Sequence, residues 1–243
     1  MWTPFSAYRD FKNKLKRDKE VRERDKLVKA VNDGIDSGVE GAYSSALCDL
    51  CRHADDPAMP GIATAIVDRI EGKEGPQGAL STSIYLMNCM QNAEVQSAVA
   101  EKTFLLAAKF DRSNEREMAG VAMAANLIAF NAPEGTDQRE RSMALWREAV
   151  GTLSKTRMGV DFAFAAASNA ALGRMGGKDG PHPLRGEAID SWYKNVTSLA
   201  KIDPAAATQE ALRIVDNYQD WGPTAPPFTA KAKEALNKLS FGN

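Results

Sequence analysis

The sequence is poor in the residues on which disulfide frameworks and histidine-dependent active sites are built. Its 243 residues include three cysteines, an odd and sparse set that argues against a disulfide-stapled secreted fold and for a reducing compartment. Only two histidines are present, so a catalytic triad would have to use His53 or His182, and each is expected to serve structure or the surface. Signs of an enzyme are therefore few, and no catalytic residue, metal site or cofactor is predicted.

Long apolar runs and signal-peptide features are also missing. The longest apolar stretch, Met118–Phe130, is interrupted by Gly120 and Asn126 and is too short to cross a bilayer. The first residues lack the basic region followed by an apolar region that a cleavable signal needs. We therefore expect a cytoplasmic protein, or one exported by a route that leaves no cleavable signal.

Strand patterns are scarce, whereas the helical period recurs nearly everywhere. Alternating β-branched runs of four to eight residues do not occur, and no Asn-Gly or Asp-Gly pair separates two such runs. Alanine, the best helix former, is abundant. Apolar residues make up 44% and charged residues 26%, close to globular averages, which excludes general disorder. We predict an all-α fold.

The first segment is expected to be helical, because Thr3 can cap a helix and Pro4 suits its first position. An apolar stripe begins there and resumes after a charged stretch; its members are Phe5, Tyr8, Phe11 and Leu15, then Leu27, Val28, Val31 and Ile35. Thr3–Asp33 is therefore either one long helix with an exposed charged middle or two helices joined near Asp18.

From Gly41 onward the sequence repeats. The segments Gly41–Ala54, Leu80–Ala93 and Ala119–Ala132 begin 39 residues apart, and a fourth copy, Phe162–Met175, follows after 43 residues. Second helices are expected between the copies, at Pro57–Glu71, Ala93–Phe110, Thr136–Lys155 and Leu184–Ile202. A two-helix unit of this length is typical of HEAT- or armadillo-like α-solenoids, in which stacking buries the apolar face that one pair cannot bury alone. The alternative is an irregular α-helical bundle whose hairpins have similar lengths.

The C-terminal region contains loops and two further helices. A flexible loop is expected at Gly173–Pro183, a helix from Asp203-Pro204 to about Tyr218, an extended proline-rich segment at Trp221–Phe228, and a last helix from Ala230 to about Leu239, capped by Thr229. We interpret residues 1–243 as a single all-α domain. It comprises a basic helical arm (1–36), about four helix pairs (37–220), and a proline-rich linker with the C-terminal helix (221–243).

Charge is balanced overall, at −1, but concentrated locally. Between Arg9 and Lys29 ten basic residues outnumber the acidic ones. The candidates for contacts with phosphates or anionic lipid are Lys12, Lys14, Lys16, Arg17, Lys19, Arg22 and Arg24. The alternative is a solvated face, with i,i+4 pairs such as Glu20–Arg24, or a contact with the acidic remainder of the chain.

Two motifs suggest chemistry, but a structural interpretation is preferred for each. Cys48-x-x-Cys51-x-His53, with Cys89, resembles half of a zinc site, yet the cysteines lie on an apolar helical face, where a thiol packs as a small hydrophobic group. The glycine-rich loop Gly176–Gly180 fits neither common phosphate-binding spacing and is interpreted as a linker.

The segment Pro223-Thr224-Ala225-Pro226 resembles the late-domain tetrapeptide with which some viral structural proteins recruit the host ESCRT machinery. The resemblance covers four residues and implies that Pro223 and Pro226 contact a partner. The alternative is a stiff spacer that docks the last helix.

Stacked helix pairs present a large ridged surface, so the sequence favours a non-enzymatic adaptor or scaffold that binds a protein partner. The alternative is a polyanion-binding structural protein, for example a viral or secreted effector, that binds nucleic acid or an anionic membrane surface through the basic arm. A third reading is an enzyme with an unrecognised site. The partners considered are a protein, a polyanion and a second copy of the chain.

Overall fold

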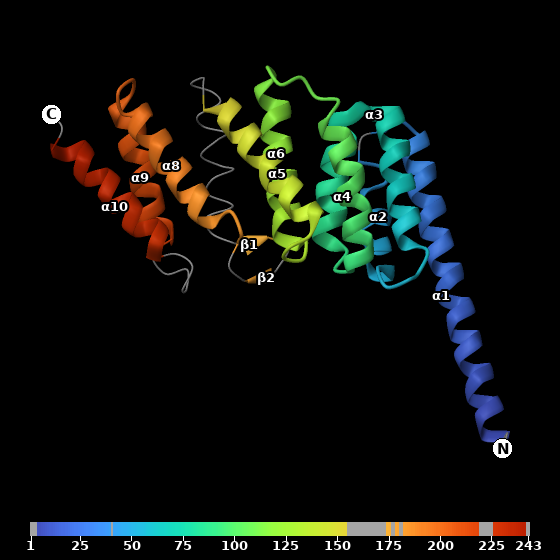
Figure 1. Cartoon of the computed structure of the whole chain (residues 1–243). Helices are drawn as coiled ribbons and strands as arrows, with labels where there is room; N and C mark the ends of the chain where they lie inside the picture. The colour runs from blue at the N-terminus through green and yellow to red at the C-terminus, as the bar shows by residue number, and fades with distance from the viewer. Residues whose placement is uncertain are drawn as a thin grey trace.

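The structure, a computed structural model, is an all-α fold whose helices lie side by side in a row (Figure 1). It describes residues 4–39, 41–154, 174–175, 178–179, 182–218 and 226–241. Helices joined by short loops run in opposite directions, and the first helix extends away from one end of the row (Figure 1). The predicted fold class is confirmed.

The described elements follow the predicted order closely. The helices are α1 (Pro4–Asp36), α2 (Ser44–Leu50), η1 (Cys51–His53), α3 (Met59–Cys89), α4 (Ala93–Ala107), α5 (Glu115–Asn131), α6 (Asp137–Leu153), α8 (Arg185–Leu199), α9 (Pro204–Tyr218) and α10 (Pro226–Phe241). Two short strands, β1 (Arg174–Met175) and β2 (Lys178–Asp179), pair antiparallel.

Side-chain caps explain where several helices begin. Asn92 accepts hydrogen bonds from two backbone N–H groups in the first turn of α4, and Asn114 does the same for α5. Thr136 accepts from the N–H of Arg139 at the start of α6. Asp203 accepts from the N–H of Ala206 at 3.0 Å, so the predicted cap followed by proline does begin α9.

Helix α3 joins two helices that the repeat predicted separately, Pro57–Glu71 and Leu80–Ala93. Gly75 lies between them with φ 79° and ψ −178°, and Pro76 follows. Proline has no N–H to continue the helix and its ring clashes with the preceding turn, while glycine accepts the positive φ without strain. The chain therefore bends here, and the two halves of α3 belong to successive helix pairs.

Polar contacts between neighbouring helices repeat the period of the sequence, with partners 33 to 41 residues apart. The pairs are Asp36–Arg69 (α1–α3), Asp68–Lys102 and Glu71–Lys109 (α3–α4), Glu101–Arg141 (α4–α6), Arg147–Glu187 (α6–α8) and Tyr193–Glu234 (α8–α10). An exposed ion pair contributes about 0–1 kcal/mol. These contacts therefore serve mainly to fix the register between helices.

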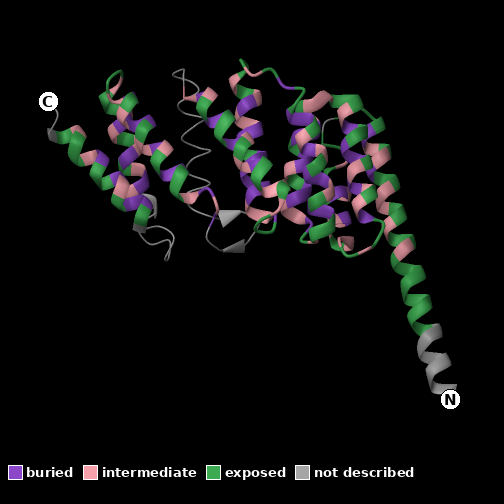
Figure 2. Cartoon of the chain, in the orientation of Figure 1, coloured by how far each residue is buried: buried purple, intermediate pink, exposed green. Residues whose placement is uncertain are grey.

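The buried apolar side chains form two clusters (Figure 2). One is built mainly from α1 to α4, and the other from α5 to α10, including the buried Trp146 and Trp192. Helices α3, α4 and α5 contribute to both; Leu80 belongs to the second cluster and Leu86 to the first. The row is therefore linked through its middle by three helices.

Several predicted boundaries in the C-terminal region are wrong. Helix α10 begins at Pro226 rather than Ala230, because proline is tolerated in a first turn and Phe228 is fully buried, packed edge to face on Trp192 at 5.0 Å. The strands β1 and β2 lie where the end of a helix and a loop were predicted. The rest of the fourth repeat copy (162–173), residues 176, 177 and 180 of the glycine-rich loop, and Pro223 to Ala225 lie outside the described residues.

Candidate interaction surface on the first helix

The predicted basic segment belongs to one continuous helix, α1. Of the two alternatives predicted for this segment, one long helix is therefore correct, and two helices joined near Asp18 are not present. Only the C-terminal end of α1 is firmly packed: Val31 and Ile35 are 0% and 3% exposed. The preceding turns extend beyond the other helices and are exposed from Lys12 to Glu20 (Figures 1 and 2).

Two stripes follow α1 on opposite sides. The body side carries Val21, Arg24, Val28, Val31 and Ile35, all partly or fully buried and spaced three and four residues apart. A second stripe has the same spacing but is offset by two residues from the first, which is about 200° around a helix. Its members are Lys12, Leu15, Lys19 and Arg22. These four residues are the outer face of α1. The prediction that the apolar stripe of Leu15 resumes at Val31 and Ile35 is therefore wrong, because these positions lie on opposite sides of α1; the side chains of Phe5, Tyr8 and Phe11 lie outside the described residues.

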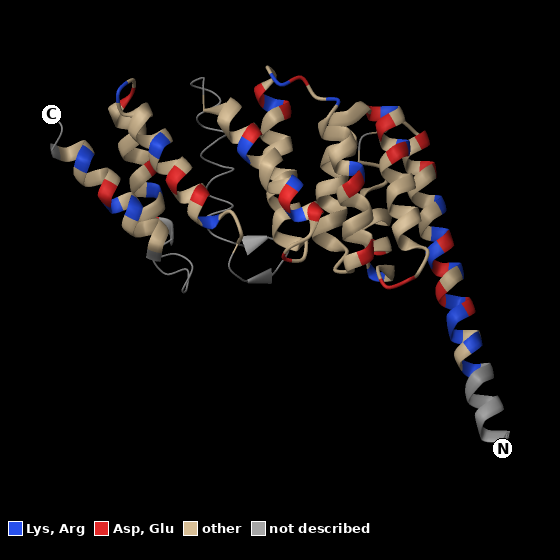
Figure 3. Ribbon diagram, viewed as in Figure 1, with Lys and Arg blue, Asp and Glu red and all other residues tan. Residues whose placement is uncertain are grey.

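Lysine and arginine residues are frequent along the projecting part of α1 (Figure 3). Most of the predicted basic residues are exposed and weakly paired. Lys16 and Lys19 approach Glu20 and Glu23 at 3.8 Å, between side chains that are more than half exposed. Four others form no ion pair with any described residue: Lys12, Lys14, Arg17 and Arg22. Their charges are therefore available to a partner.

Arg24 is different, because it anchors α1 to the body of the protein. Its side chain is 13% exposed and donates to Asp25 at 2.6 Å and to Asp56 at 2.7 Å. Burial alone would raise the pKa of Asp56, but the N–H of Ala58 and the Arg24 guanidinium outweigh it and hold that pKa below its usual value. Sequence reasoning placed Arg24 among the partner contacts, whereas its charge is already used within the chain.

A groove of about 1230 Å³ separates α1 from the segment that follows α2. Charged residues of both signs line it, together with His53; on α1 they are Lys16, Arg17, Glu20, Glu23, Arg24 and Lys26, and opposite them Asp49, Arg52, Asp55 and Asp56. The apolar groups of Val21, Leu27 and Pro57 form part of its wall. Its size and mixed charge suit a polypeptide segment better than a small molecule.

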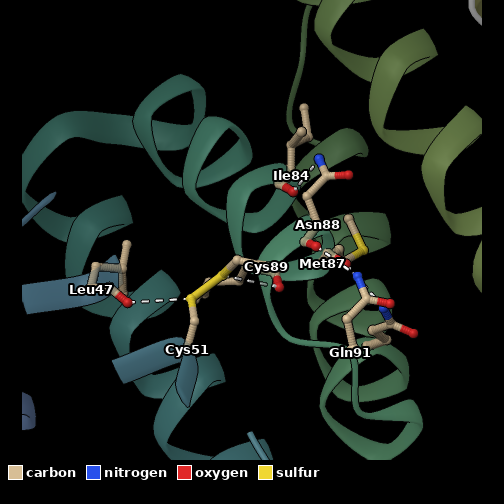
Figure 4. The surroundings of a disulfide bond; sticks show 9 residues. Leu47, Cys51, Ile84, Met87, Asn88, Cys89 and Gln91 are labelled. Atoms are coloured by element: carbon tan, nitrogen blue, oxygen red, sulfur yellow. Dashed lines mark hydrogen bonds between the residues drawn. A yellow bond between two sulfur atoms is a disulfide. The ribbon is translucent and has the colours of Figure 1, made fainter. Parts of the chain in front are cut away.

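Two of the three cysteines form a disulfide, which corrects the prediction of unpaired thiols. Cys51 at the start of η1 bonds Cys89 at the end of α3, with 5.9 Å between their Cα atoms (Figure 4). A disulfide leaves no thiolates for zinc, so these residues do not form the suggested half-site. Cys48 is the free, exposed cysteine, and its hydrogen bond, together with burial, raises the pKa of Tyr85. The repeat gave a signal that was missed, since Cys51 and Cys89 lie 38 residues apart.

The two histidines occupy different environments. His53 lies at the end of η1 and lines the groove. His182 is 3% exposed, stacks on Phe130, accepts the N–H of Leu184 through Nδ1, and directs Nε2 to the carbonyl of Asn126, both at 3.0 Å. Burial lowers the pKa of His182 to about 4. His182 therefore joins α5 to the start of α8 as a neutral imidazole.

The comparisons with known proteins found no match to any protein-family model, curated protein or solved structure. Within the described ranges, no group of three or more histidine, cysteine, aspartate or glutamate residues is arranged to hold a metal ion. None of the described helices has both the length and the apolar character needed to cross a bilayer.

Proposed function

We propose that the protein is a non-enzymatic adaptor, in which a HEAT- or armadillo-like row of helix pairs holds a protein partner. The groove between α1 and the segment after α2 carries this proposal. Its volume of about 1230 Å³ exceeds that of most small-molecule sites, and its lining of opposite charges over an apolar wall resembles the polar rim and apolar centre of protein interfaces. The Arg24–Asp56 ion pair supports it, because the pair joins the two walls of the groove and holds them in a fixed position.

A charge-reversal experiment tests the groove. Arg17 and Arg52 line it, and their reversal together (Arg17→Glu with Arg52→Glu) leaves the partly buried Arg24–Asp56 pair intact. The matched control reverses Lys194 and Lys201, which are exposed near the end of α8. Tagged full-length proteins are incubated with lysate of the source cells, with and without nuclease and at low and high salt, and captured proteins are identified by mass spectrometry.

We expect a stoichiometric protein partner that survives nuclease and salt, binds the wild type and the control equally, and is lost from the groove variant. Equal capture by the groove variant would exclude the groove as the binding site. Capture of nothing, or of material that nuclease or salt removes entirely, would overturn the adaptor function.

A second candidate function is polyanion binding through α1, which the outer face favours. Lys12, Lys19 and Arg22 repeat there at three- and seven-residue spacing, and of the four acidic residues between Lys12 and Lys26 none belongs to that stripe. Basic side chains along one side of a helix can follow a row of phosphates. The residues to change in a test are these three, because reversing Arg24 would break its contact with Asp56.

The location is proposed with the function. Of the two locations predicted from the sequence, the cytoplasm and an exported location, the Cys51–Cys89 disulfide favours the second, since disulfides persist in oxidising compartments. Alkylation of free thiols in intact cells, followed by mass spectrometry, tests this: a protected Cys51–Cys89 pair supports export, and three alkylated cysteines support the cytoplasm.

A further inference from the structure

The outer face of α1 combines basic and apolar side chains that no described part of the chain covers. Lys12, Lys19 and Arg22 are exposed, and Leu15 between them is 54% exposed. An anionic partner alone would pair with the basic side chains but would not bury the leucine side chain. The face is therefore suited to a partner that has both anionic groups and an apolar phase.

The body of the protein cannot supply that partner. Val31 and Ile35 fix the side of α1 that packs on the row, and the outer face lies about 200° away from that side. The three- and four-residue spacing of the outer face also continues toward the N-terminus through sequence positions Tyr8 and Phe5. The stripe from position 5 to position 22 corresponds to about 26 Å of helix, and it combines apolar and basic residue types.

We propose that the outer face of α1 binds the surface of an anionic phospholipid bilayer, with the helix lying along the interface; this rests on the second candidate function, polyanion binding through α1. The lysine and arginine side chains reach the lipid phosphates, while Leu15 enters the boundary below the headgroups. A nucleic acid duplex would engage the basic residues alone and would leave Leu15 in water. Leu15 therefore decides between the two partners.

Substitutions on the outer face should change the affinity for anionic vesicles by measurable amounts. Each basic residue near an anionic membrane contributes about 1 kcal/mol, so the loss of three corresponds to a weakening of roughly 100-fold. Burial of one leucine side chain contributes about tenfold or somewhat more in affinity. Both effects exceed the error of a vesicle-binding assay.

Binding of the full-length protein to vesicles tests the proposal. The vesicles are phosphatidylcholine alone or with a roughly 30% share of phosphatidylserine, and a duplex DNA and a single-stranded RNA of similar charge serve as the other probes. The basic variant carries Lys12→Gln, Lys19→Gln and Arg22→Gln. Its matched control carries Lys194→Gln, Lys201→Gln and Lys233→Gln, at exposed positions on the rest of the molecule. A third variant, Leu15→Gln, keeps the charge unchanged.

We expect the wild type and the control to bind the phosphatidylserine vesicles and not the neutral ones. The basic variant should bind about 100-fold more weakly and Leu15→Gln about tenfold more weakly. All substituted positions are exposed, so thermal melting should show every variant folded.

Other results separate the failure of this inference from the failure of the function on which it rests. Tight binding to nucleic acid that Leu15→Gln leaves unchanged, with weaker vesicle binding, would overturn the membrane surface and retain polyanion binding. Absence of binding to vesicles and to both nucleic acids at low salt would overturn both.

Discussion

The buried histidine makes the stability of the protein depend on pH in a way that one substitution should remove. His182 is neutral in the folded protein, because Nδ1 accepts a hydrogen bond from the Leu184 N–H and Nε2 donates to the Asn126 carbonyl. Protonation of Nδ1 would place two donors face to face and bury a positive charge. Burial is the main cause of the lowered pKa of about 4; the charge of Arg139 lowers it further, and the Asn126 contact opposes both.

The direction of the pH dependence follows from the pKa of His182 in the folded and in the unfolded protein. In the unfolded chain the pKa of His182 returns to its ordinary value of 6.5, so between about pH 6.5 and pH 4 the unfolded state binds a proton that the folded state does not. Stability from this group is complete above pH 6.5 and falls as the pH is lowered. The shift corresponds to about 3 kcal/mol in full, of which about 2 kcal/mol is lost by pH 5.

Urea unfolding followed by circular dichroism between pH 5 and pH 8 measures this effect. His182→Gln retains an amide that can donate or accept but does not titrate, so we expect a loss of about 1–2 kcal/mol at pH 7.5 together with a weaker dependence on pH. His53→Gln, which removes the other histidine, is the matched control and should keep the pH dependence of the wild type. If His182→Gln and the wild type lose the same free energy of unfolding between pH 7.5 and pH 5, the assignment of a neutral buried imidazole is wrong.

Three further predictions concern the attachment of α1 and the first helix pair. Cys51→Ser should lower the free energy of unfolding by about 4 kcal/mol, from the 38-residue separation of the cysteines, whereas Cys48→Ser should have little effect; equal melting temperatures for the two variants would contradict the disulfide. Arg24→Ala should cost about 1–3 kcal/mol in chemical denaturation because it leaves Asp56 unpaired, and Arg22→Ala should cost less than about 0.5 kcal/mol; similar costs would contradict the anchoring role. Gly34→Ala should lower the free energy of unfolding by about 1–3 kcal/mol, because the added Cβ would lie 2.9 Å from the Tyr43 backbone. Gly72→Ala is the control: its Cβ meets nothing within 4 Å, so it should raise the free energy of unfolding by about 0.5–1 kcal/mol. A Gly34→Ala protein as stable as the wild type would refute the close contact.

Periodicity predicted the helices well because local patterns decide them. The predicted start of α9 at Asp203-Pro204 is correct, and so is the start of α4 at Ala93, because a cap or a proline marks each position in the sequence. The kink at Gly75 was harder, since the same dipeptide could end one helix or bend a continuous one, and the difference depends on how the two halves pack. The start of α10 was missed because the burial of Phe228 against Trp192 is a tertiary contact that extends the helix over two prolines.

The candidate site shows a sharper limit of sequence reasoning. The basic residues of α1 could be found by composition, but their division between an exposed outer face and a buried anchor could not. Arg22 and Arg24 are two residues apart and chemically identical, yet one is exposed and the other holds Asp56, because a shift of two residues reverses the side of a helix. The same geometry places Leu15 and Val31 on opposite sides, although each looked like part of one apolar stripe.

The disulfide and the Arg24–Asp56 ion pair together define how α1 can act. Arg24 holds the middle of α1 against the loop after η1, and the bond between Cys51 and Cys89 ties η1 to the end of α3. The base of the projecting helix is therefore fixed to the second helix pair as well as the first, while the turns from Lys12 to Glu20 have no such contact. The groove and the outer face therefore lie on different sides of one helix, and these two contacts hold the base of that helix in place.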